Sequence, residues 1–216
     1  MEKQDILNAL EKLNADSKKR KFTQRVELIA NLKALDLKKT ENQVDFYVAL
    51  PHHSGKKKSI CALVGPELKD EGDSCDEVIT LDDFQKYQQD KKLAKALADR
   101  HDYFVAQANI MPKVAQAFGR VLGPRGKMPN PKAGCIVPPK GSLKPVYDKL
   151  QYLERVSAKT QSLVQVAIGT QEMKPEEIAD NAQTVYDQLI HHLPLEINNL
   201  KNVLIKYTMS KPEKVA

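Results

Sequence analysis

The sequence predicts an α/β protein in which a discontinuous α+β domain, built from both ends of the chain, carries an inserted α/β domain. Two observations support this prediction. Near both ends, apolar and polar residues alternate with a period of two, which is typical of half-buried strands. In the middle, short continuous apolar runs alternate with helical segments, which indicates a parallel sheet covered on both faces. The predicted domains are therefore 1–58 with 151–216, and 59–150.

The first 58 residues are predicted to contribute one helix and two strands. Apolar residues at helical spacing predict a helix over about residues 3–14. Period-two alternation predicts strands over residues 26–32 and 44–50. The segment LPHHSGKKK that follows is turn-like, with Pro51 and Gly55 as punctuation, and it ends this block.

The middle of the chain is predicted to form the inserted domain. Strands are expected over residues 60–64, 77–81 and 103–106, with helical segments around 82–99, which gives a three-layer, Rossmann-like arrangement. Residues 112–145 hold seven of the 12 prolines of the chain, so we expect a long structured loop there.

The last part of the chain returns to the first pattern. Strands are expected over residues 162–169 and 202–209, and a helix is expected to begin at Pro175, a residue favoured in the first helical turn. The discontinuous domain then has a four-stranded sheet and two helices. The chain passes between the domains twice, near 55–59 and 150–155, and such paired crossings predict a hinge.

Charge is unevenly distributed along the chain. The formal net charge is +6, but residues 112–150 carry eight basic residues against one acidic residue. Residues 1–58 carry 13 basic residues against eight acidic ones, whereas the stretch between these two segments is acidic. Two basic segments that flank an acidic one favour a polyanionic partner.

The composition excludes several other classes of protein. The longest apolar run, residues 60–64, is far shorter than the roughly 20 residues of a membrane span, and the first residues do not resemble a secretory signal. Cys61, Cys75 and Cys135 are odd in number and widely spaced, which disfavours a disulfide framework and a zinc site. We therefore expect a cytoplasmic protein with free thiols and no cofactor or metal.

The sequence lacks the glycine-rich motifs that hold nucleotide phosphates. GxxxxGK[ST] and GxGxxG are both absent, which argues against a nucleotide-binding enzyme built on the inserted domain. Residues 123–126 formally match a GxxG loop, so a GxxG-type RNA-binding regulator stays an alternative. The pairs His52-His53 and His191-His192 have no clear acidic partner in sequence and are expected to face solvent.

Two short segments carry residues suited to RNA. The first is a basic run that ends in an aromatic ring, and its members are Lys18, Lys19, Arg20, Lys21 and Phe22. Cations there can pair with phosphates while the ring stacks on a base or ribose, although a solvated linker is the alternative interpretation. The second segment closes the last strand, and its members are Thr208, Met209, Ser210 and Lys211. Taken alone, this second segment resembles a frayed terminus.

Four strings together resemble the L1 family of large-subunit ribosomal proteins. These strings are KFTQRVE at 21–27, LPHHSGK at 50–56, VLGPRGKMPNPKAG at 121–134 and KYTMSKP at 206–212. Their order and spacing agree with the family over nearly the whole chain, and the length and Lys-Pro ending resemble archaeal members.

The resemblance implies a non-enzymatic protein of the ribosome whose discontinuous domain grips large-subunit rRNA at a mobile stalk. It implies RNA contacts at Phe22, Glu27, Thr208, Met209 and Ser210, where Ser210 stands in place of the family's glycine. It also implies assistance to the release of tRNA from the exit site, and repression of translation by some members through their own mRNA. A free monomer that joins the ribosome is expected.

The basic proline-glycine string is predicted to serve the moving end of the stalk. Arg125 and Lys127 lie on it, within the inserted domain and in a region of strong positive charge. The alternative function is a GxxG-type RNA-binding regulator outside the ribosome, which sedimentation with ribosomes would distinguish.

Overall fold

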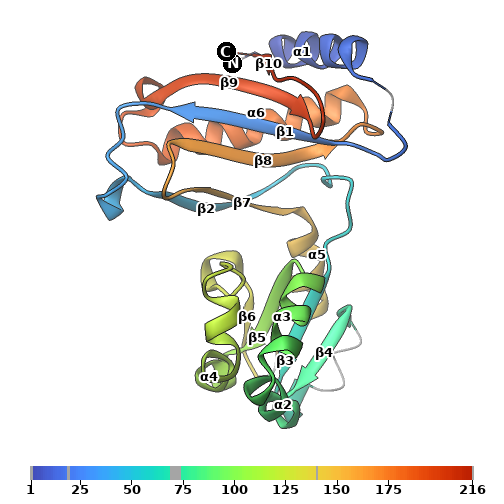
Figure 1. The fold of residues 1–216 in the computed structure, drawn as a ribbon, viewed down its shortest axis with the longest axis vertical. Helices are drawn as coiled ribbons and strands as arrows, with labels where there is room; N and C mark the ends of the chain where they lie inside the picture. The colour runs from blue at the N-terminus through green and yellow to red at the C-terminus, as the bar shows by residue number, and fades with distance from the viewer. Residues whose placement is uncertain (1, 19, 69–73, 140, 216) are drawn as a thin grey trace. The chain divides into compact units, whose positions relative to one another are not determined.

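The structure is a computed structural model that describes residues 2–18, 20–68, 74–139 and 141–215 (Figure 1). The chain divides into two compact units, which are described separately. Unit 1 joins Met1–Lys56 to Tyr152–Ala216, and unit 2 is Lys57–Gln151. The combination of an antiparallel sheet in unit 1 with a parallel sheet in unit 2 confirms the predicted α/β fold class.

Unit 1 is built on an antiparallel sheet of four strands in the order β10-β9-β1-β8. The strands are β1 (Arg25–Leu32), β8 (Leu163–Thr170), β9 (Leu200–Tyr207) and β10 (Glu213–Lys214). Every second residue of β1 is buried, beginning with Val26, because period-two alternation turns apolar side chains to one face. The alternate residues, Glu27, Ile29 and Asn31, are half-buried on the other face.

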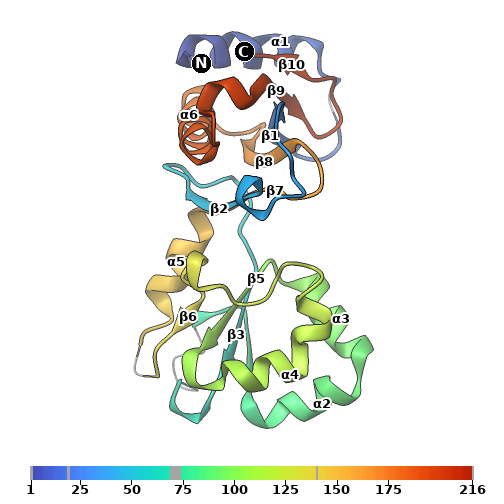
Figure 2. The same ribbon diagram turned by 90° about the vertical axis from the view of Figure 1, so that its left-hand side faces the viewer.

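Two helices pack on the buried face of this sheet (Figure 2). They are α1 (Lys3–Asp16) and α6 (Pro175–His192), and each presents an apolar stripe to the core. Ile6, Leu10 and Leu13 of α1 are at most 1% exposed. Burial of each such side chain contributes roughly 1.5–3 kcal/mol, so this interface holds both helices against the sheet.

A second, two-stranded sheet in unit 1 corrects the predicted four-stranded arrangement. Strand β2 (Val44–Ala49) pairs with β7 (Leu153–Ala158) rather than with the main sheet. The fourth strand of the main sheet is the short β10, which the sequence analysis did not predict. The β2–β7 pairing also carries an ion pair, because the guanidinium of Arg155 lies 2.8 Å from Asp45 Oδ1.

The histidines at 52 and 53 have structural contacts in unit 1. The fully buried amide of Asn181 accepts from His52 N at 2.9 Å and donates to His52 O and Ile168 O at 3.0 and 2.8 Å. His53 accepts the N–H of Gly55. Both histidines are half-buried, and the His52 ring lies 3.6 Å from Asp180 Oδ2, an acidic neighbour that the sequence did not reveal. His192 is exposed but stacks on Phe46, with ring centroids 3.8 Å apart.

Unit 2 is built on a parallel sheet in the order β4-β3-β5-β6. The strands are β3 (Ile60–Val64), β4 (Glu77–Thr80), β5 (Tyr103–Gln107) and β6 (Ile136–Val137). The helices are α2 (Phe84–Gln89), α3 (Lys91–Arg100), α4 (Met111–Leu122) and α5 (Lys144–Tyr152). Figure 2 shows α5 on one face of the sheet and the other three helices on the opposite face, which gives the predicted three layers. All five residues of β3 are buried, as expected for a strand covered on both faces.

Helix α4 lies inside the segment that was predicted to be a loop. Pro112 stands in its first turn, where a missing N–H costs nothing, so this proline does not interrupt the helix. Val114, Phe118 and Leu122 form its buried stripe. The prolines that follow lie among shorter elements, including β6 and the beginning of α5. None of the described helices is long and apolar enough to cross a membrane.

Candidate nucleic-acid interface

Strand pairing in unit 1 brings the two predicted RNA segments together. Strands β1 and β9 are antiparallel, and Val26 lies opposite Tyr207, so the start of one strand meets the end of the other. Just beyond the pair, Thr208 N donates to Arg25 O at 3.1 Å and Arg25 N donates to Thr208 Oγ1 at 3.2 Å. The residues around Phe22 and those around Met209 therefore share one end of the main sheet.

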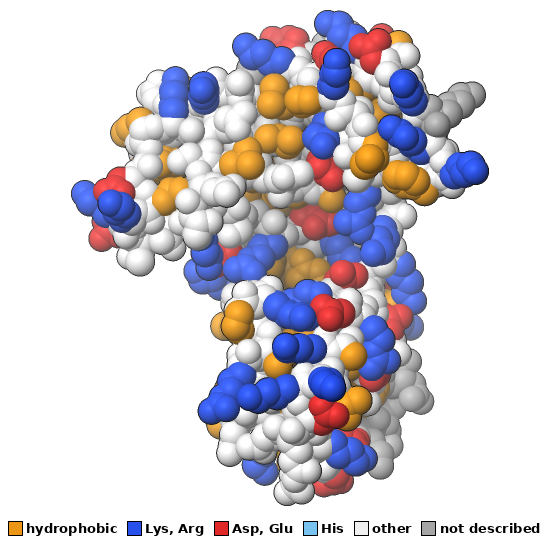
Figure 3. Space-filling model, in the orientation of Figure 1, with side chains coloured by type: hydrophobic (Ala, Val, Ile, Leu, Met, Phe, Trp, Pro, Cys, Tyr) orange, Lys and Arg blue, Asp and Glu red, His pale blue; other side chains and the backbone are white. Residues whose placement is uncertain are grey.

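This end of the sheet is basic and has exposed apolar side chains. Phe22 and Met209 are 54% and 58% exposed, which is unusual for side chains of their size. Lys18, Arg20 and Lys211 are also exposed around them. In Figure 3, Lys and Arg side chains gather beside hydrophobic ones at the end of the sheet where β1 begins and β9 ends. We call this region the β1–β9 surface, and its members are Lys18, Arg20, Lys21, Phe22, Thr208, Met209, Ser210 and Lys211. Lys19, which was also predicted to bind RNA, lies outside the described residues.

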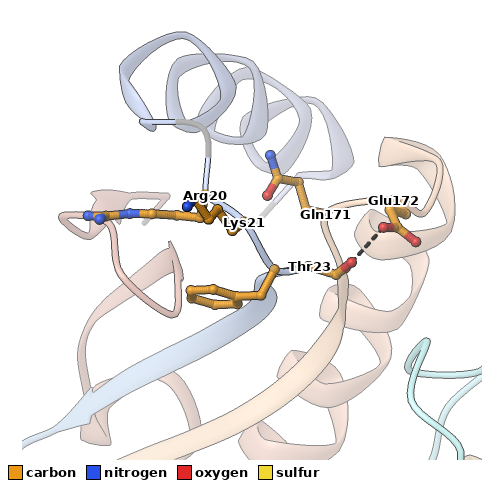
Figure 4. Close-up of a pocket in the computed structure, with 6 residues that line it drawn as sticks. Arg20, Lys21, Thr23, Gln171 and Glu172 are labelled. Carbon is orange, nitrogen blue, oxygen red and sulfur yellow. Dashed lines mark hydrogen bonds between the residues drawn. The ribbon is translucent and has the colours of Figure 1, made fainter.

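Two adjoining hollows shape the β1–β9 surface. One, of about 530 Å³, lies between the end of α1 and the turn after β9, and it is lined by Lys18, Met209 and Lys211 among others. The other, of about 480 Å³, lies beside Phe22 and is shown in Figure 4. Arg20 lines both hollows. Acidic residues also line these hollows, Asp16 and Glu213 in the first and Glu172 in the second. The exposed cations can hold a phosphate backbone while the apolar side chains contact bases or riboses.

Gln24 fixes the positions of the two segments that form this surface, one around Phe22 and one around Met209. Its side chain is buried, and Gln24 Oε1 accepts the N–H of Met209 at 3.1 Å. Its backbone oxygen accepts the N–H of Gln171 at 2.9 Å, which fixes the loop after β8 beside the start of β1. Gln24 was not among the predicted site residues, although the sequence contains one signal for it. Gln24 is in phase with Val26 and Leu28, so a polar side chain falls at a buried position of a strand.

Ser210 takes part in a turn that its hydroxyl helps to form. Ser210 Oγ accepts the N–H of Tyr207 at 2.9 Å, and Ser210 N donates to Tyr207 O at 3.1 Å. Ser210 is not among the described residues with positive φ. A glycine is therefore not required by the backbone at this position, and the serine uses its side chain to close the strand.

The end of α1 is tied to the same surface. Tyr207 is buried, and its hydroxyl donates to Asn14 Oδ1 at 2.5 Å. Burial raises the pKa of Tyr207, so the phenol stays protonated and keeps this donor at neutral pH. Helix α1 and the basic linker after it are thereby anchored to the end of β9.

Glu27 lies on the outer face of the sheet, two residue pairs inward from the contact between Arg25 and Thr208. Gln165 Nε2 donates to Glu27 Oε2 at 2.6 Å, and Lys206 occupies the opposite position on β9. Farther along the same face, Asn31 Nδ2 donates to Asn202 Oδ1 at 2.6 Å. Glu27 is thus an oriented acceptor in a row of polar side chains that leads away from the β1–β9 surface.

The two basic residues of the proline-glycine string have partners within unit 2. The ammonium of Lys127 donates to Ala98 O at 2.8 Å and to His101 O at 2.7 Å, at the end of helix α3. This is a favourable position for a cation, because the last carbonyls of a helix lack partners within it. The guanidinium of Arg125 pairs with Asp99 on the same helix. Both cations therefore hold the string against α3, and their role at the moving end of the stalk stays a prediction.

The GxxG match at residues 123–126 belongs to the same turn. Gly126 N donates to Gly123 O at 3.0 Å directly after α4, and Gly126 has a positive φ of 65°. Among the described residues, no group of three or more His, Cys, Asp or Glu side chains is arranged to hold a metal ion.

Proteins with sequences similar to this one are ribosomal proteins of the large subunit. A profile of the ribosomal protein L1p/L10e family matches residues 13–211, and the chain belongs to this family. The resemblance found in the sequence is thereby confirmed. Membership in a family of structural ribosomal proteins also agrees with the prediction that the chain is not an enzyme.

The relatives align over nearly their full lengths. The large ribosomal subunit protein uL1 of Nanoarchaeum equitans is 44% identical over 205 residues, which cover 93% of this chain and 94% of the relative. The uL1 protein of Methanobrevibacter smithii is 39% identical over 210 residues, or 95% and 96% of the two chains. That of Methanothermococcus thermolithotrophicus is 33% identical over 216 residues, or 100% and 99%. These relatives are archaeal, as the length and the Lys-Pro ending of the chain predicted.

Proposed function

We propose that this protein is a structural constituent of the large ribosomal subunit and binds large-subunit rRNA through the β1–β9 surface. The observation that carries the proposal is the meeting of two segments 183 residues apart in sequence, Arg25 and Thr208, beside exposed Phe22 and Met209. Family membership supports it, because the relatives are named as large-subunit ribosomal proteins.

Cations and neutral side chains have different tasks in this proposal. Lys18, Arg20, Lys21 and Lys211 attract phosphates, which gives a salt-dependent contribution without sequence preference. Phe22 and Met209 pack against bases or riboses of unpaired nucleotides, since a large part of each side chain is exposed. Thr208 Oγ1 accepts the N–H of Arg25 at 3.2 Å and donates to Arg25 O at 3.5 Å, so the oriented hydroxyl oxygen can still accept a hydrogen bond from a 2′-hydroxyl or a base edge.

The finer roles follow from the family resemblance. The rRNA site is a mobile stalk of the large subunit, and the protein assists the release of deacylated tRNA from the exit site. Unit 2, joined to unit 1 by two crossings, serves the moving end of the stalk. Binding to a similar structure in its own mRNA, with repression of translation, is a second proposed activity. A GxxG-type regulator outside the ribosome is disfavoured, because Gly123 and Gly126 form a turn braced by Arg125 and Lys127.

Part of the support for a hinge lies in the first crossing. Gly55 has a φ of +81°, and a Cβ there would lie 2.5 Å from Thr170 Oγ1. Only glycine adopts this conformation at such close approach without strain. On the other side of the crossing, the buried pair Lys58 and Gln151 exchange two hydrogen bonds of 2.9 and 3.0 Å within unit 2. Bending is therefore expected between residues 55 and 58.

Binding to rRNA and sedimentation with ribosomes test the proposal together. The purified full chain should bind a transcript containing the stalk rRNA and cosediment with large subunits. A Phe22→Ala, Met209→Ala double variant that stays folded should lose most of this binding. Full-strength binding by the double variant would refute the site, and failure of the wild-type chain to sediment with large subunits would favour the regulator.

A further inference from the structure

The side-chain amide of Gln24 has a donor that the protein leaves without a partner. Gln24 is 1% exposed and lines the hollow between the end of α1 and the turn after β9, which we call the Met209 hollow. Its oxygen, Oε1, accepts the N–H of Met209 at 3.1 Å. Its nitrogen, Nε2, makes no hydrogen bond to any residue that the structure describes.

The contact with Met209 fixes which end of the Gln24 amide is free. A backbone N–H needs an acceptor, so Oε1 must face Met209 N, and Nε2 lies next to it because both atoms are bonded to one carbon. Nε2 can still be reached from solvent, since no buried side-chain nitrogen or oxygen in the described part of the chain lacks both a partner and access. The Met209 hollow therefore contains an oriented N–H donor beside the backbone of Met209.

A buried donor without a partner is an exception that calls for an explanation. Buried polar side chains normally have their hydrogen bonds satisfied within the protein or by water. Asn181 follows this rule, because its amide oxygen and nitrogen both have backbone partners. Gln24 departs from it at the end of the sheet that carries exposed Phe22 and Met209. Its free donor at this place points to an acceptor supplied by the RNA.

The charges of the Met209 hollow favour a neutral acceptor over a phosphate. Lys18, Arg20 and Lys211 line the hollow, but so do Asp16 and Glu213. Moving a charged phosphate to an almost fully enclosed nitrogen, in a hollow that also holds carboxylates, costs more than moving a neutral oxygen there. We therefore assign phosphates to the exposed cations and a neutral oxygen to Gln24 Nε2.

The Met209 hollow has room for part of one nucleotide. Its volume of about 530 Å³ lies in the range of sites that bind small molecules. The side chain of Met209 is 58% exposed, and its flexible thioether can pack against a base or a ribose. A group bound to Nε2 lies next to Met209, because Oε1 of the same amide holds the Met209 backbone. RNA offers two kinds of neutral acceptor oxygen there, the carbonyl of a base and the 2′-hydroxyl of a ribose.

We propose that Gln24 Nε2 donates a hydrogen bond to a neutral oxygen, a base carbonyl or a 2′-hydroxyl, of one nucleotide that packs on Met209. This inference rests on the proposed rRNA binding and adds to it a buried donor. Gln24 then has two tasks, since Oε1 positions the segment around Met209 and Nε2 contacts the RNA. Removing the acceptor oxygen from that nucleotide should weaken binding by about 5- to 150-fold, because a buried donor is left unpaired.

Analogue interference mapping with the full chain tests this inference. The probe is a transcript containing the stalk rRNA, in which a few nucleotides are replaced at random. One set of analogues lacks the 2′-hydroxyl, and a second set carries a thiocarbonyl in place of a base carbonyl. Each analogue has a phosphorothioate tag that iodine cleaves, so its position can be read in the bound and the free RNA. We expect a position at which one of the two sets is depleted from the RNA bound to the wild-type protein.

Gln24→Glu removes the donor and keeps an acceptor for the N–H of Met209. The depletion at that position should vanish in this variant, while depletion at other positions persists. Gln171→Glu is the matched control, because it makes the same change in the other hollow, where Thr23 Oγ1 already donates to Glu172 Oε1 at 2.5 Å (Figure 4). This control should keep the depletion. The added charge cancels, since each variant is compared with its own binding to unmodified RNA.

Two further measurements apply if the buried carboxylate of Gln24→Glu prevents folding. Gln24→Met is neutral and similar in length, and it lacks the donor, so the same depletion should vanish. With the wild-type protein alone, the loss of affinity caused by the analogue should be equal at 50 and 200 mM salt, because a neutral oxygen releases no counterions. A loss that changed with salt would contradict a neutral acceptor.

The outcomes distinguish this inference from the proposed function. Depletion that persists in folded Gln24→Glu or Gln24→Met would overturn the contact with Nε2 while leaving rRNA binding intact. Binding by the wild type without depletion of either set of analogues would also overturn it. Depletion that depends on Gln24 but follows the phosphorothioate tag alone would assign the donor to a phosphate and overturn the neutral acceptor. Failure of the wild type to bind the transcript would instead overturn the proposed function.

Discussion

The salt response of rRNA binding gives a quantitative prediction from the structure. Four described cations lie on the β1–β9 surface, namely Lys18, Arg20, Lys21 and Lys211. If each neutralises one phosphate, the logarithm of the association constant should fall with the logarithm of salt concentration with a slope of about −2.8 to −3.6. Between 50 and 200 mM salt, affinity should then fall by about 50- to 150-fold.

Removing one of these cations should change the slope by a predictable amount. Lys21→Ala should make it shallower by roughly 0.7–0.9, so its affinity ratio between the two salt concentrations should differ from wild type by about threefold. Fluorescence anisotropy of a labelled stalk transcript, titrated at five or more salt concentrations, measures this difference.

Lys201→Ala is the matched control for this experiment. Lys201 is exposed at the beginning of β9, seven residues from Thr208 and therefore about 23 Å away along the strand. Its removal should leave the slope unchanged. An unchanged slope for Lys21→Ala, or an equal change for Lys201→Ala, would refute the assignment of phosphate contacts to the β1–β9 surface.

Four further predictions test other parts of the account. Phe22→Ala and Met209→Ala should each weaken rRNA binding by about 1–3 kcal/mol without changing the salt slope, because these are stacking and packing contacts. The charge reversal Arg125→Glu with Lys127→Glu should leave rRNA binding unchanged. Lys127→Met should lower the free energy of unfolding in urea by about 1–3 kcal/mol, because two hydrogen bonds to carbonyls at the end of α3 are lost. Asn181→Leu should destabilise unit 1 by about 3 kcal/mol in the same assay, because three backbone groups lose a buried partner. Burial opposes ionisation of Asp45, but Arg155 and Lys159 hold the pKa of its carboxyl below the ordinary value. The wild type should therefore melt at a higher temperature than Asp45→Asn at pH 7, and this difference should shrink as the pH falls below about 4. An advantage that stayed constant from pH 7 to pH 2 would contradict this role of Asp45.

Three of the four strands of the main sheet of unit 1, β1, β8 and β9, were predictable because they are half-buried. Alternation in β1 places Val26, Leu28 and Ala30 on the core side, and such a pattern has no helical equivalent. The parallel strands of unit 2 were predictable for a different reason, since β3 is a short apolar run bounded by turns.

The pairing of β2 with β7 could not be read from local pattern. The partners Asp45 and Arg155 are 110 residues apart, and β7 begins directly after α5 without a turn signal. Helix α4 differs from the predicted loop because the prolines of residues 112–145 have different structural roles. Pro112 belongs to a helix start, and only the later prolines lie between short elements.

The charged segments of the site were predictable from the sequence, but the hydrogen bonds that position their side chains were not. Lys18 to Phe22 and Thr208 to Lys211 stand out as local strings, and their closeness follows from antiparallel pairing of two recognised strands. The bond from Thr23 to Glu172 depends instead on where the loop after β8 lies in space. Likewise, Lys127 looks free in sequence because its partners are the carbonyls of a helix about 30 residues earlier.

Site-specific photocrosslinking within the ribosome tests the central claim most directly. A benzoylphenylalanine is placed at position 22, 209 or 197 of the full chain, and crosslinked nucleotides are mapped in assembled large subunits. Ile197 is the matched control, because it is 58% exposed like Met209 but precedes β9 at the other end of that strand. We predict crosslinks from positions 22 and 209 to neighbouring nucleotides of one rRNA site, and none from position 197 to that site. Crosslinks to that site from position 197 alone would contradict the account.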